Sequence, residues 1–142
     1  MKPIIYYQNI DQYRYELVAD YQTTVKIKPE SGIHHQYFTL TMGGLLTIKA
    51  GYMWDGATFP AIDSKDFMRG SLVHDCLYQC MRLGLLPQTC RLAADEELRR
   101  ICLEDGMWPI RAWWVYNCVR LFAGDCAKQK TNLTEYQVLT AP

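Results

Sequence analysis

The spacing of apolar residues changes once along the chain, and this change limits the fold more than any other feature. Tyr13–Lys28 and Tyr37–Ala50 are rich in β-branched and aromatic residues, with stretches that alternate polar and apolar positions as strands do. From Phe67 to Gly124, apolar residues instead recur every three or four positions, the spacing of one helix face. We therefore predict an α+β fold, in which a small N-terminal antiparallel sheet is followed by about three packed helices.

Glycine and proline mark the boundaries of these elements. Gly43-Gly44 predicts a hairpin between Tyr37–Met42 and Leu45–Ala50. Glycine commonly follows the last turn of a helix and proline commonly opens the first. The predicted helices are accordingly Phe67–Leu83 before Gly84, Pro87–Asp105 before Gly106, and a third from Pro109 to about Gly124.

The length of 142 residues is sufficient for one domain with its own core. We predict a single domain, 1–142, with a β-rich part at 1–50, a motif loop at 51–65, a helical part at 66–124 and a tail or arm at 125–142.

The helical spacing also predicts which residues face the core. The expected apolar faces are Leu72, Val73, Cys76, Leu77 and Cys80 on the first helix, Ala94, Leu98, Ile101 and Cys102 on the second, and Ile110, Trp113, Trp114, Cys118, Leu121 and Phe122 on the third. At this spacing Trp113 and Trp114 are expected in the core or in an interface, rather than in a carbohydrate or nucleic-acid site.

Charge and hydropathy exclude several classes of partner. Lys and Arg together number 15, as do Asp and Glu, so the formal net charge is zero and nothing attracts the chain over long range to nucleic acid. No apolar run reaches 18 residues, so we expect no membrane span. The N-terminus turns polar after Ile4-Ile5, which does not suit a signal peptide. We therefore expect synthesis in a reducing cytoplasm, with six free thiols and no structural zinc.

His74, Tyr78 and Asp95 form the first candidate site. His74 and Tyr78 are four residues apart and share a helix face. Asp95 shares a face with Leu98 and Cys102, so its carboxylate is aimed at the core, where an unpaired charge is costly. Because neighbouring helices joined by a short connection are antiparallel, we predict direct contact between His74 and Asp95.

Two interpretations of this contact remain open. A His–Asp dyad fixes the tautomer of the imidazole, which is what a general base needs, so His74, Asp95 and Tyr78 are candidate catalytic residues. Alternatively, the pair ties two helices together, and Arg91, four residues before Asp95, neutralises the carboxylate.

Asp55 and Asp75 form the second candidate site, a metal site. Asp55-Gly56 is a turn signal inside the motif loop, and Asp75 follows His74 on the first helix. Together with backbone carbonyls, the two carboxylates would supply oxygen ligands for a hard divalent cation such as calcium. The alternative is a rigid turn without a ligand, and we expect no other cofactor.

Four linked motifs give the sequence a family resemblance. They are Asp55-Gly56-Ala57-Thr58-Phe59-Pro60, His74-Asp75-Cys76-Leu77-Tyr78, Arg91-Leu92-Ala93-Ala94-Asp95 and Val119-Arg120-Leu121-Phe122. In this order they resemble a family of uncharacterised tailed-phage and prophage proteins with D-x-A-[ST]-x-P, H-D-x-L-Y and R-x-x-A-D motifs. The resemblance covers Gly51 to Gly124, about half the chain, and implies a phage origin without a reaction.

A more distant resemblance concerns mechanism. The H-D-x-x-Y pattern with an aspartate on the next helix is similar to that of small phospholipases A2. This likeness implies that His74 is a general base, that Asp75 holds calcium, and that Asp95 orients His74 while accepting a hydrogen bond from Tyr78. The chain departs from those enzymes because it lacks their glycine-rich, cysteine-flanked calcium loop and their disulfide framework.

Three functions follow as hypotheses. The first is a phage virion or assembly protein, such as a tail component, that contacts other phage structural proteins or forms homo-oligomers. The second is a small ester hydrolase with His74 as general base. The third is a host-takeover factor that binds a bacterial protein. We favour the first, because the sheet and the tail offer interaction surface without site chemistry, and we expect the protein in the host cytoplasm during synthesis and then in the virion.

Overall fold

The structure, a computed structural model, describes residues 4–11, 14–56 and 64–128. It divides into two compact units, the first ending at Asp55 and the second beginning at Gly56. The prediction of a single domain for 1–142 stays a prediction. We describe each unit by itself.

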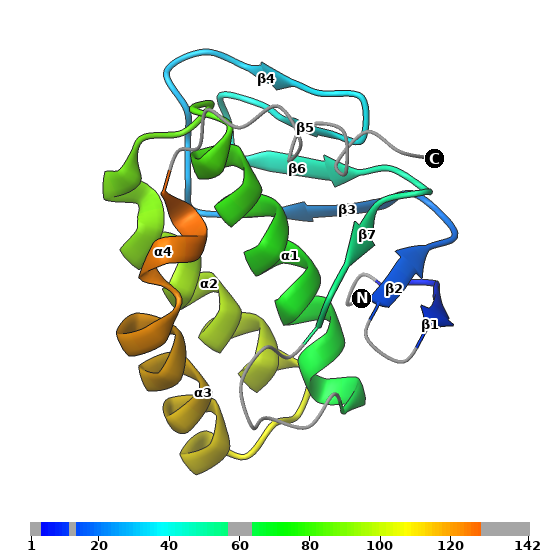
Figure 1. The fold of residues 1–142 in the computed structure, drawn as a ribbon, viewed down its shortest axis with the longest axis vertical. Coiled ribbons are helices and arrows are strands. Elements are labelled where there is room, and N and C mark those ends of the chain that lie inside the picture. Colours follow the sequence, from blue (N-terminus) through cyan, green and yellow to red (C-terminus); the bar gives the residue numbers. More distant parts are fainter. Residues whose placement is uncertain (1–3, 12–13, 57–63, 129–142) are drawn as a thin grey trace. The chain divides into compact units, whose positions relative to one another are not determined.

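The first unit contains two antiparallel sheets. One has the order β1-β2-β7 and consists of β1 (Tyr7–Asp11), β2 (Arg14–Leu17) and β7 (Met53–Trp54). The other has the order β3-β6-β5-β4 and consists of β3 (Tyr21–Thr24), β4 (Ile33–His34), β5 (Phe38–Leu40) and β6 (Leu45–Ile48) (Figure 1). All pairs are antiparallel, which confirms the predicted N-terminal part of the fold.

The predicted hairpin is present and sets the register of the second sheet. Leu40 of β5 lies opposite Leu46 of β6, and both are fully buried. The turn between them is closed by the Gly44 amide, which donates to the Thr41 carbonyl at 3.0 Å. Alternation along β3 also agrees with the sequence, since Tyr21 and Thr23 are buried and their neighbours exposed.

Two short strands differ from the sequence prediction. β7 lies inside the stretch predicted as loop, where Met53 and Trp54 pair with β2, and β1 lies in a segment for which we predicted no element. Tyr7, Tyr15 and Trp54 explain both, because their ring centroids lie 5.6 to 5.8 Å apart in one cluster. Aromatic edge contacts of this kind stabilise short strands without producing an alternating pattern.

The second unit is helical. Its helices are α1 (Lys65–Arg82), α2 (Arg91–Glu104), α3 (Pro109–Phe122) and the short α4 (Gly124–Ala127), and a single 3-10 turn, Gln88–Cys90, precedes α2. The longer helices run alternately up and down, and α2 packs against both α1 and α3 (Figure 1). The predicted α+β class, with about three packed helices after the sheet, is confirmed. α4 occupies the start of the predicted tail, and residues 129–142 lie outside the described residues.

Glycine ends α1 and α2 as predicted. Gly84 and Gly106 have φ values of 73° and 96°, a left-handed conformation that only glycine adopts without strain. The residue after each glycine then donates its amide back into the helix, Leu85 to the Cys80 carbonyl at 2.8 Å and Met107 to the Cys102 carbonyl at 2.9 Å. These caps fix the directions in which the next helices leave.

The predicted core faces of α1 and α2 are confirmed. All nine residues named for these two faces have 0 or 1% of their surface exposed. The helices approach closely at Gly70, where an added Cβ would lie 2.9 Å from Cys102 Sγ and 3.1 Å from Leu98 Cδ1. Glycine is therefore required at this crossing.

The predicted core face of α3 is wrong. Trp113 is 56% exposed, Ile110 80% and Leu121 75%, whereas Ala112 and Val115 are buried. The reason is steric, because α3 is apolar on two faces and the one with small side chains lets its backbone come closer to α2. The large side chains are left on the opposite face.

Among the described residues, no helix has the length and hydropathy to cross a membrane. All six cysteines are unpaired, as expected.

Candidate functional site

The predicted contact between His74 and Asp95 is confirmed. His74 lies in the middle of α1 and Asp95 in the second turn of α2, and His74 Nε2 is 2.7 Å from Asp95 Oδ1. Both side chains are buried, with 6% of His74 and none of Asp95 exposed. The helical spacing therefore placed both residues on the correct faces.

Asp95 accepts two further hydrogen bonds. The Tyr78 hydroxyl donates to Oδ1 at 2.6 Å, and Arg120 Nη1 of α3 donates to Oδ2 at 2.9 Å. Tyr78 also stacks on His74, with ring centroids 4.1 Å apart. Both oxygens of the buried carboxylate are thus satisfied by charged or polar partners, which a buried charge requires.

Arg91 extends the cluster to the end of α3. Its Nε donates to the Tyr78 hydroxyl at 3.1 Å, and its Nη2 donates to the carbonyls of Val119 and Arg120 at 2.8 and 2.7 Å. Carbonyls in the last turn of a helix lack partners within the helix, and a guanidinium there also opposes the negative end of the helix dipole. We call His74, Tyr78, Arg91, Asp95 and Arg120 the three-helix cluster, because they join α1, α2 and α3.

The surroundings of His74 and Asp95 shift their pKa values in opposite directions. Burial disfavours the charged imidazole, but Asp75 and Asp95 outweigh it and raise the pKa of His74 above its ordinary value of 6.5. Burial likewise disfavours the Asp95 carboxylate, but hydrogen bonds from His74, Tyr78 and Arg120 hold the pKa of Asp95 below 3.8. Burial and Asp95 raise the pKa of Tyr78 well above 10, so its hydroxyl stays a donor. The pair therefore favours an imidazolium bound to a carboxylate.

This arrangement restricts the chemistry available to His74. With Nε2 bonded to Asp95, only Nδ1 remains to accept a proton from a nucleophile, and Nδ1 lies 3.7 Å from Asp75 Oδ1. A general base must begin neutral and must reach the proton that it removes. The raised pKa of His74 keeps the ring charged, and its low exposure keeps it from a substrate, so both properties oppose a role as general base. Both properties are expected of a buried ion pair that holds two helices together.

The two proposed metal ligands belong to different units of the structure. Asp75 lies on α1 in the second unit and Asp55 at the end of the first. Residues 57–63, which hold most of the D-x-A-[ST]-x-P motif, lie outside the described residues. Within the described ranges, no group of three or more His, Cys, Asp or Glu side chains is placed to hold a metal ion.

Sequence reasoning missed the role of Arg120. We predicted Arg91 as the residue that neutralises Asp95, but Arg91 Nε lies 4.0 Å from Asp95 Oδ2, and Arg120 makes the 2.9 Å bond. Arg69 was also missed. It is buried on α1 and bonded to Glu104 and Asp105 at the end of α2. An arginine beside the apolar face of a helix was the available signal in both cases, because such a charge needs a carboxylate from another element.

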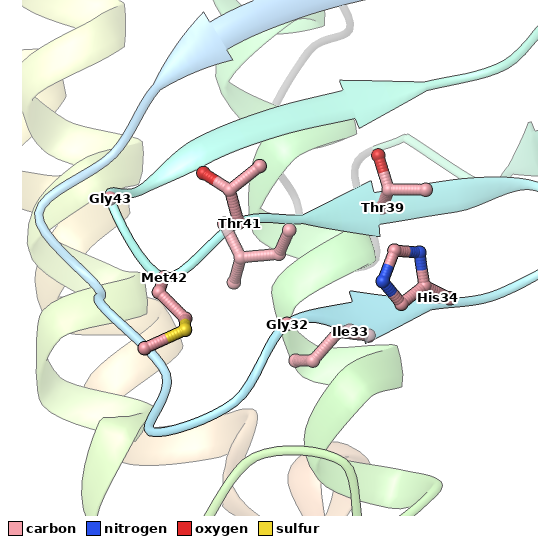
Figure 2. A pocket seen from close by; sticks show the side chains of 8 residues that line it. Gly32, Ile33, His34, Thr39, Thr41, Met42 and Gly43 are labelled. Carbon is pink, nitrogen blue, oxygen red and sulfur yellow. The ribbon is translucent and has the colours of Figure 1, made fainter.

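One pocket lies in the first unit. It lies along β4 and β5, where Ile33, His34, Thr39, Thr41 and Met42 line it (Figure 2). His34 is the one titratable side chain in this lining, so the lining contains no acid–base pair.

Comparison of the chain with protein-family models, curated proteins and solved structures finds no match. The phage-family and phospholipase resemblances therefore stay predictions.

Proposed function

We propose that this protein is a phage virion or assembly protein that acts through protein–protein contacts. The observation that carries the proposal is an exposed apolar face formed by Ile110, Trp113, Trp114 and Leu121 of α3, together with the exposed Trp108 that precedes the helix. We call it the tryptophan face. Exposed apolar side chains are common singly, but several large ones gathered on one helix are typical of interaction sites.

The three-helix cluster supports the same proposal. A catalytic dyad requires only the histidine and the aspartate. Arg91 and Arg120 are not needed for it, but both are needed to join α3 to the other helices. Arg91 binds the end of α3, and Arg120 neutralises Asp95 from α3. Together they fix the rotation of α3 about its axis, and so they determine which of its faces remains exposed.

The phage origin rests on the family resemblance of the four motifs. Its expected partners are other phage structural proteins, and the chain would occupy the host cytoplasm before entering the virion. A host protein as partner is the alternative, and the tryptophan face fits either partner.

The direct test is incorporation into particles. Particles produced with the wild-type chain should contain it at a fixed stoichiometry after purification, and particles produced with Trp113→Glu should contain much less. Leu92→Glu is the matched control, because Leu92 is also an exposed apolar residue, on α2. Absence of the wild-type chain from purified particles would contradict the proposal.

An ester hydrolase is the second candidate, and one observation favours it. Asp95 Oδ1 accepts from both His74 and Tyr78, which is the pairing that the phospholipase A2 resemblance implies. In this candidate function, Asp75 would hold a calcium ion.

His74→Gln separates the two functions. An enzyme should lose esterase or lipase turnover by about two orders of magnitude or more and keep its fold. An assembly protein should show no turnover with either chain, and the variant should lose stability. Added calcium should raise turnover only if the hydrolase is correct.

A further inference from the structure

We infer that the tryptophan face binds a second copy of this chain, with the two α3 helices antiparallel across a two-fold axis. The inference rests on the proposed function, because it names a partner for the same face. Three properties of α3 support it: the absence of charge on the face, its area and the order of its residues.

The face is neutral because both arginines of α3 are directed to carboxylates of their own unit. Arg111 Nη1 bonds to Ser64 and Asp66 at the start of α1, at 2.8 and 3.2 Å. Arg120 bonds to Asp95. Neither guanidinium is therefore left to project from the exposed side of the helix.

The polar residue within the stripe bonds to the backbone of its own helix. Asn117 lies between Trp113 and Leu121 on this side of α3, and its amide Nδ2 donates to the Trp113 carbonyl of the same helix at 2.8 Å. One of its two N–H donors is thus occupied within the helix, and a partner that covers Asn117 must bond to the remaining N–H and to Oδ1.

A neutral face suits a second copy better than it suits other partners. In a two-fold interface a residue close to the axis meets its own symmetry mate, so a charge near the centre of the face would meet a like charge. An amphipathic helix that binds membrane surfaces usually has Lys or Arg beside its apolar face. Here the two flanking arginines are already paired with carboxylates of their own unit.

The area of the face is close to that of a stable dimer. Trp108 and Ile110 are each 80% exposed, Trp113 56% and Leu121 75%. With Trp114 they expose roughly 700 Å² of mostly apolar surface, and a standard interface buries about 800 Å² on each partner. Contacts by residues around the face would supply the remaining buried area.

The order of residues along α3 fits an antiparallel pair. Ile110, Trp113, Trp114 and Leu121 follow the spacing i, i+3, i+4 and i+11, which is one face of a helix. Reversing a second α3 about the middle of this stripe sets Ile110 opposite Leu121. It also sets the two tryptophans of each copy beside the smaller Asn117 and Cys118 of the other, so large side chains meet small ones.

Sedimentation of the full chain over concentrations from about 1 to 100 µM tests the inference. The wild-type protein should reach a plateau at twice the 16.5 kDa of one chain. Trp113→Glu should weaken association by about thirtyfold or more, because it replaces a central aromatic with a charge. Leu92→Glu should associate like wild type, and circular dichroism should show all variants folded.

A mixing experiment tests the two-fold geometry. Trp113→Glu and Trp113→Lys should each be monomeric alone and should associate when mixed, since the two residues at position 113 lie on either side of the axis and opposite charges there attract each other. A wild-type chain that stays monomeric would overturn the inference, as would dimers insensitive to Trp113→Glu or a mixture that does not associate. A monomeric chain that still enters particles through Trp113 would leave the proposed function intact, so the two failures are distinguishable.

Discussion

Asp95→Ala should destabilise the helical unit by about 3–5 kcal/mol. Asp95 is fully buried and accepts hydrogen bonds from His74, Tyr78 and Arg120 at 2.7, 2.6 and 2.9 Å. Each hydrogen bond to a charged group contributes about 1.5–3 kcal/mol, so three such bonds set an upper bound of roughly 5–9 kcal/mol. Arg120 is partly exposed and recovers hydration in the variant, which reduces the loss to the stated range.

Thermal and urea unfolding followed by circular dichroism at pH 7 measures this loss. A change of 3–5 kcal/mol in a chain of this size lowers Tm by roughly 10–20 °C. Glu96→Ala is the matched control, because Glu96 is the next residue on α2 and is exposed. We expect the free energy of unfolding of this control to lie within about 0.5 kcal/mol of wild type.

Asp95→Asn separates shape from charge. The amide keeps the size of the side chain and an acceptor for Tyr78, but it removes the negative charge that faces Arg120 and His74. Its stability should fall between those of wild type and Asp95→Ala. If Asp95→Ala unfolds within about 1 kcal/mol of wild type, Asp95 is solvated and the role of the three-helix cluster as a tie is refuted.

Further predictions concern packing, pH and thiol reactivity. Gly70→Ala should cost about 1–3 kcal/mol in urea unfolding, because the new methyl group overlaps Cys102 Sγ. Since folding raises the pKa of His74, its stabilisation should be complete below pH 6.5 and should decline as pH rises through the folded pKa. Urea titrations from pH 5 to 9 should show this decline in wild type but not in His74→Gln, and an equal slope in both would contradict it. A thiol reagent should modify the exposed Cys126 first in the native protein and all six cysteines after unfolding, whereas Cys102, whose pKa burial raises to about 12, should stay protected until then.

The sequence was informative where one face of an element differs clearly from the other. On α1 the buried face carries nearly all the large apolar residues, whereas on α2 Leu98 and Ile101 are buried and Leu92 and Leu103 are exposed. The apolar spacing was still enough to place His74 against Asp95. The glycine signals at Gly84 and Gly106 were equally direct, because a left-handed residue after a helix is nearly always glycine.

On α3 the same reasoning failed for a physical reason. Ala112, Val115 and Val119 form a second apolar face opposite the tryptophans, and spacing alone does not say which face meets α2. The error had a second consequence. In the predicted orientation of α3, with Trp113 in the core, Arg120 is turned to a different side. The bond between Arg120 and Asp95 could therefore not be predicted. β1 and β7 were missed because their stability comes from contacts among Tyr7, Tyr15 and Trp54, which are distant in sequence.

The three-helix cluster has a consequence for folding kinetics. Its hydrogen bonds need α1, α2 and the last turn of α3 docked together, so they form only after the helices have assembled. Interactions that appear late lower the rate of unfolding and leave the folding rate nearly unchanged. We therefore expect Asp95→Ala to shorten the lifetime of the native state, with refolding almost as fast as in wild type. The contacts of the cluster thus form last on folding and break first on unfolding. By slowing unfolding, they lengthen the time for which α3 stays docked with the tryptophan face exposed.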